Sequence, residues 1–153
     1  MKRIVSLVLV ALFAVAVFAG CGTAKTEKKV DLNAVMETIN SENDFGGLKK
    51  LDTTDDLLRY YGVEADDVKQ FAAERDKNNE IVMIEAKNAE AASRVEAALN
   101  EKLNSLVNYS TSYSPEKAEQ VKACKVTKDG NFVSLIVTDN AESVVQTYQN
   151  SIK

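Results

Sequence analysis

The chain has 153 residues, of which 45% are hydrophobic and 27% charged, and its formal net charge is −4. This length suits one domain with a single core, and the acidic balance lacks the basic footprint that nucleic-acid binding requires. The sequence contains no histidine, which removes the commonest general base and the usual zinc ligand.

Residues 1–20 have the pattern of a bacterial secretory signal. Lys2 and Arg3 precede an apolar run over 4–19 that only Ser6 interrupts. As a helix, this run is about 24 Å long, which is shorter than the roughly 30 Å hydrocarbon core of a bilayer. The pattern therefore predicts a cleaved signal peptide rather than a membrane span.

The end of this segment, Phe18-Ala19-Gly20-Cys21, resembles the lipobox of bacterial lipoproteins, which usually has leucine where this chain has Phe18. In that motif the cysteine thiol receives a diacylglyceryl group, and cleavage follows between Gly20 and Cys21. Two or three acyl chains give stable attachment to a membrane. We therefore expect a lipoprotein anchored through Cys21 on the extracytoplasmic face of the cell membrane. The alternative is an ordinary secreted protein that carries a cysteine at this position.

Residues 21–30 comprise the lipidated cysteine and a short polar tether, and residues 31–153 form one domain. Nine flexible residues span roughly 15–18 Å on average, so we expect the domain to lie close to the bilayer. With Cys21 lipidated, Cys124 has no cysteine to pair with. It lies in the segment 122–126, which looks like a strand, and there a small buried side chain is favoured over a reactive thiol.

The first part of the domain predicts two short helices. Asp31 is a typical N-cap residue for a helix over 32–41. The pattern Thr53-x-x-Asp resembles a capping box for a second helix over 55–61, which Gly62 would end.

The segment 68–76 is ambiguous. Its apolar residues suit a helix, but a strand would pair with the next segment. Asn78-Asn79 indicates a turn, and the apolar run over 81–84 predicts a short buried strand.

The clearest helix follows, because apolar residues recur at helical spacing from 92 to 106 and Asn88 stands at its N-cap position. Pro115 marks the start of another short helix.

The last third predicts a hairpin and a helix. Strands over 122–127 and 131–137 flank a turn at Gly130. Asp139 and Glu142 resemble a capping box for the final helix. The whole order predicts an α+β fold, a small antiparallel sheet of two hairpins with helices packed on one face.

Five short motifs occur in order along 30–153: Val30-Asp31-Leu32, Tyr60-Tyr61-Gly62 followed by Asp66-Asp67-Val68, Glu80-Ile81, Tyr113-Ser114-Pro115-Glu116, and Gly130-Asn131-Phe132-Val133. With them the chain resembles an uncharacterised bacterial lipoprotein family, domain of unknown function 4358, found mainly in Gram-positive anaerobes. The resemblance implies a Gram-positive cell membrane and a strand over 68–76. It implies no activity, since none is established for the family.

No catalytic signature is present. The sequence lacks Gly-x-Ser-x-Gly, a phosphate-binding glycine loop and Cys-x-x-Cys, so we expect a protein without enzymatic activity or cofactor. Acidic residues crowd one segment and are the oxygen ligands that calcium prefers. They do not match the spacing of a calcium loop, and we interpret them as solvated helix caps: Asp52, Asp55, Asp56, Glu64, Asp66 and Asp67.

Tyrosines are the candidate contacts with a partner, because tyrosine is enriched at interfaces. The candidate partner or ligand surface is Tyr60, Tyr61, Asp66, Asp67 and Tyr113, with Tyr109 as a further exposed candidate. Tyr61 and Tyr113 equally suit packing in the core or in a turn, and packing is the interpretation we favour over a partner site.

Three functions follow, in decreasing order of support. The first is an interaction domain near the membrane surface, whose partner is envelope material or a membrane protein. The second is a lipoprotein that binds a small ligand or metal and delivers it to a transporter. The third is a carboxylate-dependent envelope hydrolase. A pocket lined by carboxylates within 52–67 would favour the second function, and an exposed patch with tyrosines would favour the first.

Overall fold

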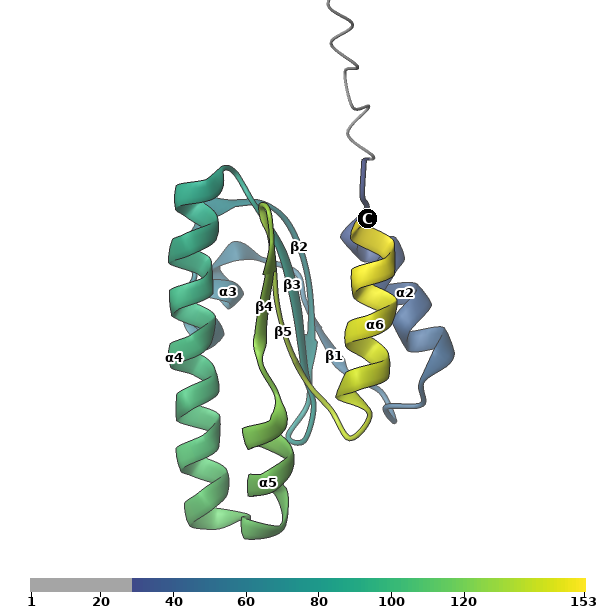
Figure 1. Cartoon of the computed structure of the whole chain (residues 1–153), viewed down its shortest axis with the longest axis vertical. Coiled ribbons are helices and arrows are strands. Elements are labelled where there is room, and N and C mark those ends of the chain that lie inside the picture. Colours follow the sequence, from purple (N-terminus) through teal and green to yellow (C-terminus); the bar gives the residue numbers. More distant parts are fainter. Residues whose placement is uncertain (1–28) are drawn as a thin grey trace, which may run out of the picture.

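A five-stranded antiparallel sheet lies between two layers of helices (Figure 1). The computed structural model describes residues 29–153, so the predicted signal peptide, its cleavage point at Gly20 and the lipidation site Cys21 lie outside the described residues. The strand order is β1-β2-β3-β5-β4. The strands are β1 (Lys49–Leu51), β2 (Val68–Arg75), β3 (Glu80–Ala86), β4 (Val126–Asp129) and β5 (Phe132–Val137).

Helices cover both faces of this sheet (Figure 1). One face carries α3 (Thr54–Tyr61), α4 (Ala89–Tyr113) and α5 (Pro115–Ala123), and the other carries α2 (Leu32–Glu42) and α6 (Ala141–Ile152). A short 3-10 turn, η1 (Ala65–Asp67), joins α3 to β2. The predicted α+β class and its two hairpins are confirmed, and β1 adds a fifth strand.

The prediction that helices pack on one face of the sheet is wrong, because helices pack on both faces. The central strand β3 shows the reason. Every residue of β3 is buried, with Val82 and Ile84 facing the α4 side and Ile81 and Met83 facing the α2–α6 side. A strand with no polar face needs a cover on both sides. The continuous apolar run is the sequence signal of this double burial.

The segment 68–76 is a strand, as the family resemblance implies. β2 pairs with β3 from Val68 to Arg75, and the connecting turn is held by Asp76, whose carboxylate accepts the backbone N–H groups of Asn78 and Asn79 at 2.6 Å. β2 also pairs with β1 on its other edge over Ala73–Arg75, so in this part of the strand sheet partners lie on both sides.

The second hairpin is confirmed with a shifted first strand. The loop has two residues, Gly130 and Asn131, because Asp129 pairs with Phe132. Gly130 has a φ of 57°, whereas only glycines have a positive φ in residues 29–153, so Asn131 does not. A positive φ at the first loop residue alone fits a turn of type II′. The strand expected over 122–127 begins only at Val126, because α5 continues to Ala123.

Three predicted helix caps are confirmed and one is corrected. The side chains of Asp31, Thr53 and Asn88 accept backbone N–H groups in the first turns of α2, α3 and α4. The predicted cap of the last helix fails because α6 starts at Ala141, which puts Asp139 outside the helix and leaves Asn140 at the cap position without a side-chain cap bond.

Two apolar cores result, one on each face. Leu57 and Leu99 are fully buried in the core below α4, and Ile39 and Tyr148 in the core below α2 and α6. Within residues 29–153, no helix combines the length and the apolar character needed to cross a bilayer.

Candidate functional site

The predicted surface residues fall into two regions. Tyr60 and Tyr61 end α3, and Asp66 and Asp67 lie in the adjoining η1 turn, so the fold brings these four together. Tyr113 is the last residue of α4. The Asp67 carboxylate contacts α4 at Arg94, 19 residues before Tyr113, which corresponds to about 28 Å along a helix.

Burial separates these residues further. Tyr61 is 3% exposed and Asp67 is 6% exposed, so both pack inside the domain. Tyr60 is half-buried, and Asp66 is exposed. Tyr113 is 74% exposed, the highest value among the large hydrophobic side chains of the described residues.

Asp67 is held by a bidentate pair with Arg94. The guanidinium donates to the two carboxylate oxygens from Nε at 3.1 and 3.0 Å and from Nη2 at 2.5 Å. These hydrogen bonds hold the pKa of Asp67 below its usual range. Because the Asp67 carbonyl also accepts the Lys87 N–H at 3.0 Å, this residue ties η1 to the β3–α4 connection and, through Arg94, to α4 itself.

Replacing Asp67 with asparagine should lower the melting temperature at neutral pH by a few degrees, since the charged pair with Arg94 is lost. The pKa of Asp67 is lower in the folded than in the unfolded state. Its contribution is therefore complete above the ordinary pKa of about 4 and disappears as the pH falls through the lowered value. Thermal melts between neutral and acidic pH should show the wild-type and variant curves converging in acid.

The matched control for this prediction is Asp66→Asn. Asp66 is the exposed neighbour of Asp67 in η1, so the same loss of charge there should leave the melting temperature nearly unchanged. Equal effects of the two substitutions would contradict a specific role for the Asp67–Arg94 pair.

A second charged cluster surrounds Glu80 under α4. Glu80 is 5% exposed, and one of its oxygens accepts Arg75 Nη2 at 3.2 Å and Lys102 Nζ at 3.1 Å. The Arg75 guanidinium lies 4.5 Å from the centre of the Tyr60 ring, and Lys102 Nζ lies 5.5 Å from that of Tyr61. This cluster joins α3, β2, β3 and α4 through side chains that are distant in the sequence.

The cluster has the character of a buried structural network. The Tyr61 hydroxyl and the second oxygen of Glu80 are both buried without a hydrogen-bond partner. Burial, with a smaller contribution from the charge of Glu80, raises the pKa of Tyr61 far above its usual range, so the phenol stays protonated. Glu80 and Tyr61 line neither the groove beside α6 nor the cavity beside α2.

The larger cavity is a groove of about 870 Å³ between α5, the β4–β5 hairpin and α6. Its lining is mostly uncharged and includes Thr138, Val145, Gln146 and Cys124. Cys124 is buried and free, and its thiol donates to the Gln120 carbonyl at 3.3 Å. Desolvation raises the pKa of the Cys124 thiol, so the residue packs as a small side chain and is a weak nucleophile, in agreement with the sequence interpretation.

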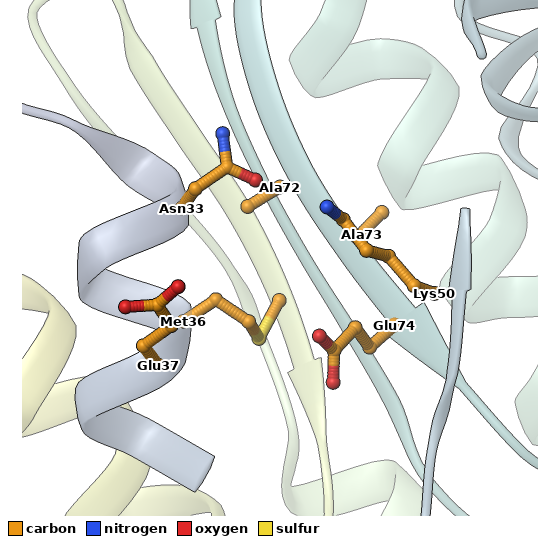
Figure 2. A pocket seen from close by; sticks show the side chains of 7 residues that line it. All are labelled: Asn33, Met36, Glu37, Lys50, Ala72, Ala73 and Glu74. Atoms are coloured by element: carbon orange, nitrogen blue, oxygen red, sulfur yellow. The ribbon is translucent and has the colours of Figure 1, made fainter. Parts of the chain in front are cut away.

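The smaller cavity, about 180 Å³, lies between α2 and the β1–β2 edge (Figure 2). Of its two alanines, Ala72 packs with the α2–α6 core and forms the floor, whereas the side chain of Ala73 belongs to the core below α4. Charged groups stand at the sides of the cavity. This volume is below the range of typical ligand pockets. The lining residues are Asn33, Met36, Glu37, Lys50, Ala72, Ala73 and Glu74.

The acidic residues between 52 and 67 do not gather around one point. Thr53 Oγ1 contacts the Asp56 carboxylate at 2.8 Å at the start of α3, and Asp67 turns toward Arg94. Across residues 29–153, no group of three or more acidic, cysteine or histidine side chains is arranged to hold a metal ion.

The C-terminal half of α4 exposes an uncharged surface. Residues 103–115 contain no charged side chain, although the average for the chain would place roughly three or four there. The rings of Tyr109 and Tyr113, which is one turn further along the helix, lie 5.0 Å apart at an angle of 34°. We call the exposed residues here the neutral face: Asn104, Ser105, Asn108, Tyr109, Thr111, Ser112 and Tyr113.

The sequence prediction names the two tyrosines of the neutral face but not the uncharged stretch around them. That stretch is visible in the sequence as the longest run without charge in residues 29–153. The helical period then puts its apolar members against the sheet and its polar members and tyrosines outward.

Comparison with known proteins identifies a family for this chain, but no relative whose function is known. The model of a family described as a domain of unknown function (DUF4358) matches residues 40–138, about two thirds of the chain. No curated protein and no solved structure matches the sequence or the fold. The matched region runs from α2 to the end of β5 and includes the whole sheet. The chain therefore belongs to this family of domains of unknown function.

Proposed function

We propose that this protein is a lipid-anchored, extracytoplasmic interaction domain without enzymatic activity. The anchor is the lipid on Cys21, supported by the signal-like residues 1–20 and the lipobox-like Phe18-Ala19-Gly20-Cys21. The tether up to residue 30 is short, and Val30 is already buried against the α2–α6 core, so the folded domain starts close to the bilayer.

Substitution of Cys21 by serine should abolish the anchor, because a hydroxyl is not nucleophilic enough to accept the lipid. We expect the wild-type chain to incorporate an alkyne-labelled fatty acid and to lose residues 1–20, and the variant to do neither, since cleavage follows lipidation. Cys124→Ser is the matched control, since Cys124 is buried inside the domain and should leave labelling unchanged. Label that persists in the Cys21 variant would refute this attachment.

The interaction role rests on one observation, the neutral face with its exposed Tyr109–Tyr113 pair. Tyrosine supplies contact area that is apolar on its ring and polar at its tip, and serine and asparagine supply adaptable hydrogen bonds. The charged groups of the domain that are buried, such as Glu80 and Asp67, are engaged in ion pairs. The surface therefore favours recognition over chemistry.

A second candidate function, binding of a small ligand for delivery to a transporter, is favoured by the groove beside α6. Its volume of about 870 Å³ is in the range of ligand pockets. The amides of Gln146 and Gln149 line it together with the charged residues Lys125, Asp139 and Glu142, so the groove would suit a polar ligand. This candidate assigns recognition to the groove and leaves the exposed tyrosines without a role.

A further inference from the structure

We infer that the neutral face of α4 binds an uncharged sugar chain of the cell envelope, an inference that rests on the proposed extracytoplasmic location. The face combines two exposed tyrosine rings, tilted against each other, with surrounding amides and hydroxyls. The flat face of a sugar ring presents C–H groups that are attracted to the negative face of an aromatic ring, and its hydroxyls pair with amides and hydroxyls. Each part of the neutral face therefore has a counterpart on a sugar.

The lack of positive charge on the neutral face excludes anionic polymers as its ligand. A phosphate- or carboxylate-bearing chain would need lysine or arginine, and residues 103–115 contain none. The domain over 31–153 also has more acidic than basic residues, which repels a polyanion at longer range. A ligand without charge needs no ion pair and is not repelled by this surface.

The size of the face favours a narrow ligand over a folded protein. A standard protein interface uses about 20–30 residues on each side. The neutral face has seven exposed residues on one convex helix and is about 15 Å long. That length is suited to a few sugar units lying along the helix.

The hydrogen-bonding groups of the face are available. Within residues 29–153, the side chains of Asn104, Ser105, Asn108 and Ser112 form no hydrogen bond to other protein groups. Thr111 is the exception, since its hydroxyl donates to the Val107 carbonyl at 2.7 Å.

The orientation of the fold also fits this role. The described chain begins beside the C-terminal end of α6, whereas the C-terminal end of α4 and α5 lie at the other end of the molecule (Figure 1). With 25 residues, α4 is about 37 Å long. A domain tethered at its first residues therefore presents Tyr109 and Tyr113 on the side away from its attachment.

The test is a titration of the full-length protein, extracted from membranes in a polyoxyethylene detergent that carries no sugar. The probes are soluble β-linked oligomers of N-acetylglucosamine and of glucose. Calorimetry measures the heat of binding at each addition. We expect saturable binding of at least one of the two oligomers, with little change between about 50 and 200 mM salt because no ion pair forms. The double variant Tyr109→Ala/Tyr113→Ala should weaken binding about tenfold or more.

Leu58→Ala is the matched control, because Leu58 is also an exposed large apolar side chain but lies on α3. It should leave binding unchanged, and equal melting temperatures would show that all variants fold. No saturable binding of either oligomer would overturn the inference, as would binding that survives in the tyrosine variant.

Two further results separate this inference from the proposed function. A protein crosslinked through the neutral face, with no sugar bound, would overturn the sugar as partner and leave an anchored interaction domain. Sugar binding by a chain that takes up no labelled fatty acid would overturn the anchor and leave the sugar site.

Discussion

Replacing Glu80 with glutamine is expected to reduce the free energy of unfolding by about 3 kcal/mol, because it removes the one carboxylate that faces both Arg75 and Lys102. The side chains of these two cations are mostly buried, so each is left in a poorly solvated position without its counter-charge. For a domain of this size the loss corresponds to a fall in melting temperature on the order of 10 °C. Urea unfolding of the two proteins, followed by circular dichroism, measures the difference.

The control for Glu80 is the same substitution at Glu96. Glu96 pairs with Lys128 across α4 and β4, but both side chains are about one-third exposed. Water can replace the lost partner there, and Glu96→Gln should cost less than about 1 kcal/mol. A cost at Glu80 no larger than that at Glu96 would contradict the buried network.

The buried network explains why part of this region could not be predicted from the sequence. Tyr60 and Tyr61 attract notice as neighbouring aromatics, yet their surroundings are set by Glu80 and Lys102, which lie 19 and 41 positions beyond Tyr61. No local pattern connects residues so far apart. Only the β2–β3 hairpin, the crossing of α4 and the position of α3 bring them together.

The helix starts were predictable because capping is local. Asp31, Thr53 and Asn88 each satisfy N–H groups two or three residues ahead, so the signal and its effect lie in the same short segment. Asp139 has the same chemistry, but Thr138 and Asn140 contact each other and set the start of α6 one residue later. Because Asn140 at the cap position makes no side-chain cap bond, the last helix starts without the cap that the local pattern predicts.

The neutral face could have been predicted in part from the sequence. Its lack of charge is a matter of composition, and its tyrosines fall one helical turn apart. The sequence does not determine whether these tyrosines are exposed or buried. The same spacing would suit a buried stripe, and only the packing of Leu103, Leu106 and Val107 against the core turns the tyrosines outward.

Burial on both faces of the sheet leads to the second large effect. Ile81 and Ile84 are both fully buried on β3, but Ile81 packs below α2 and α6 and Ile84 packs below α4. Each substitution to alanine removes several methyl and methylene groups and leaves a cavity, so each should cost about 2–5 kcal/mol. Denaturant unfolding of the two variants measures both costs in the same protein.

Ile152→Ala is the control for these two substitutions, since Ile152 makes the same change of side chain at the half-buried end of α6 and should cost only about 1 kcal/mol. A sheet covered on one face would expose either Ile81 or Ile84, and one of the two substitutions would then resemble the control. Comparable large losses at both positions are the result that a doubly covered sheet requires. They would also place α2 and α6 among the elements that stabilise the domain, although the family match from residue 40 to 138 includes only the end of α2 and none of α6.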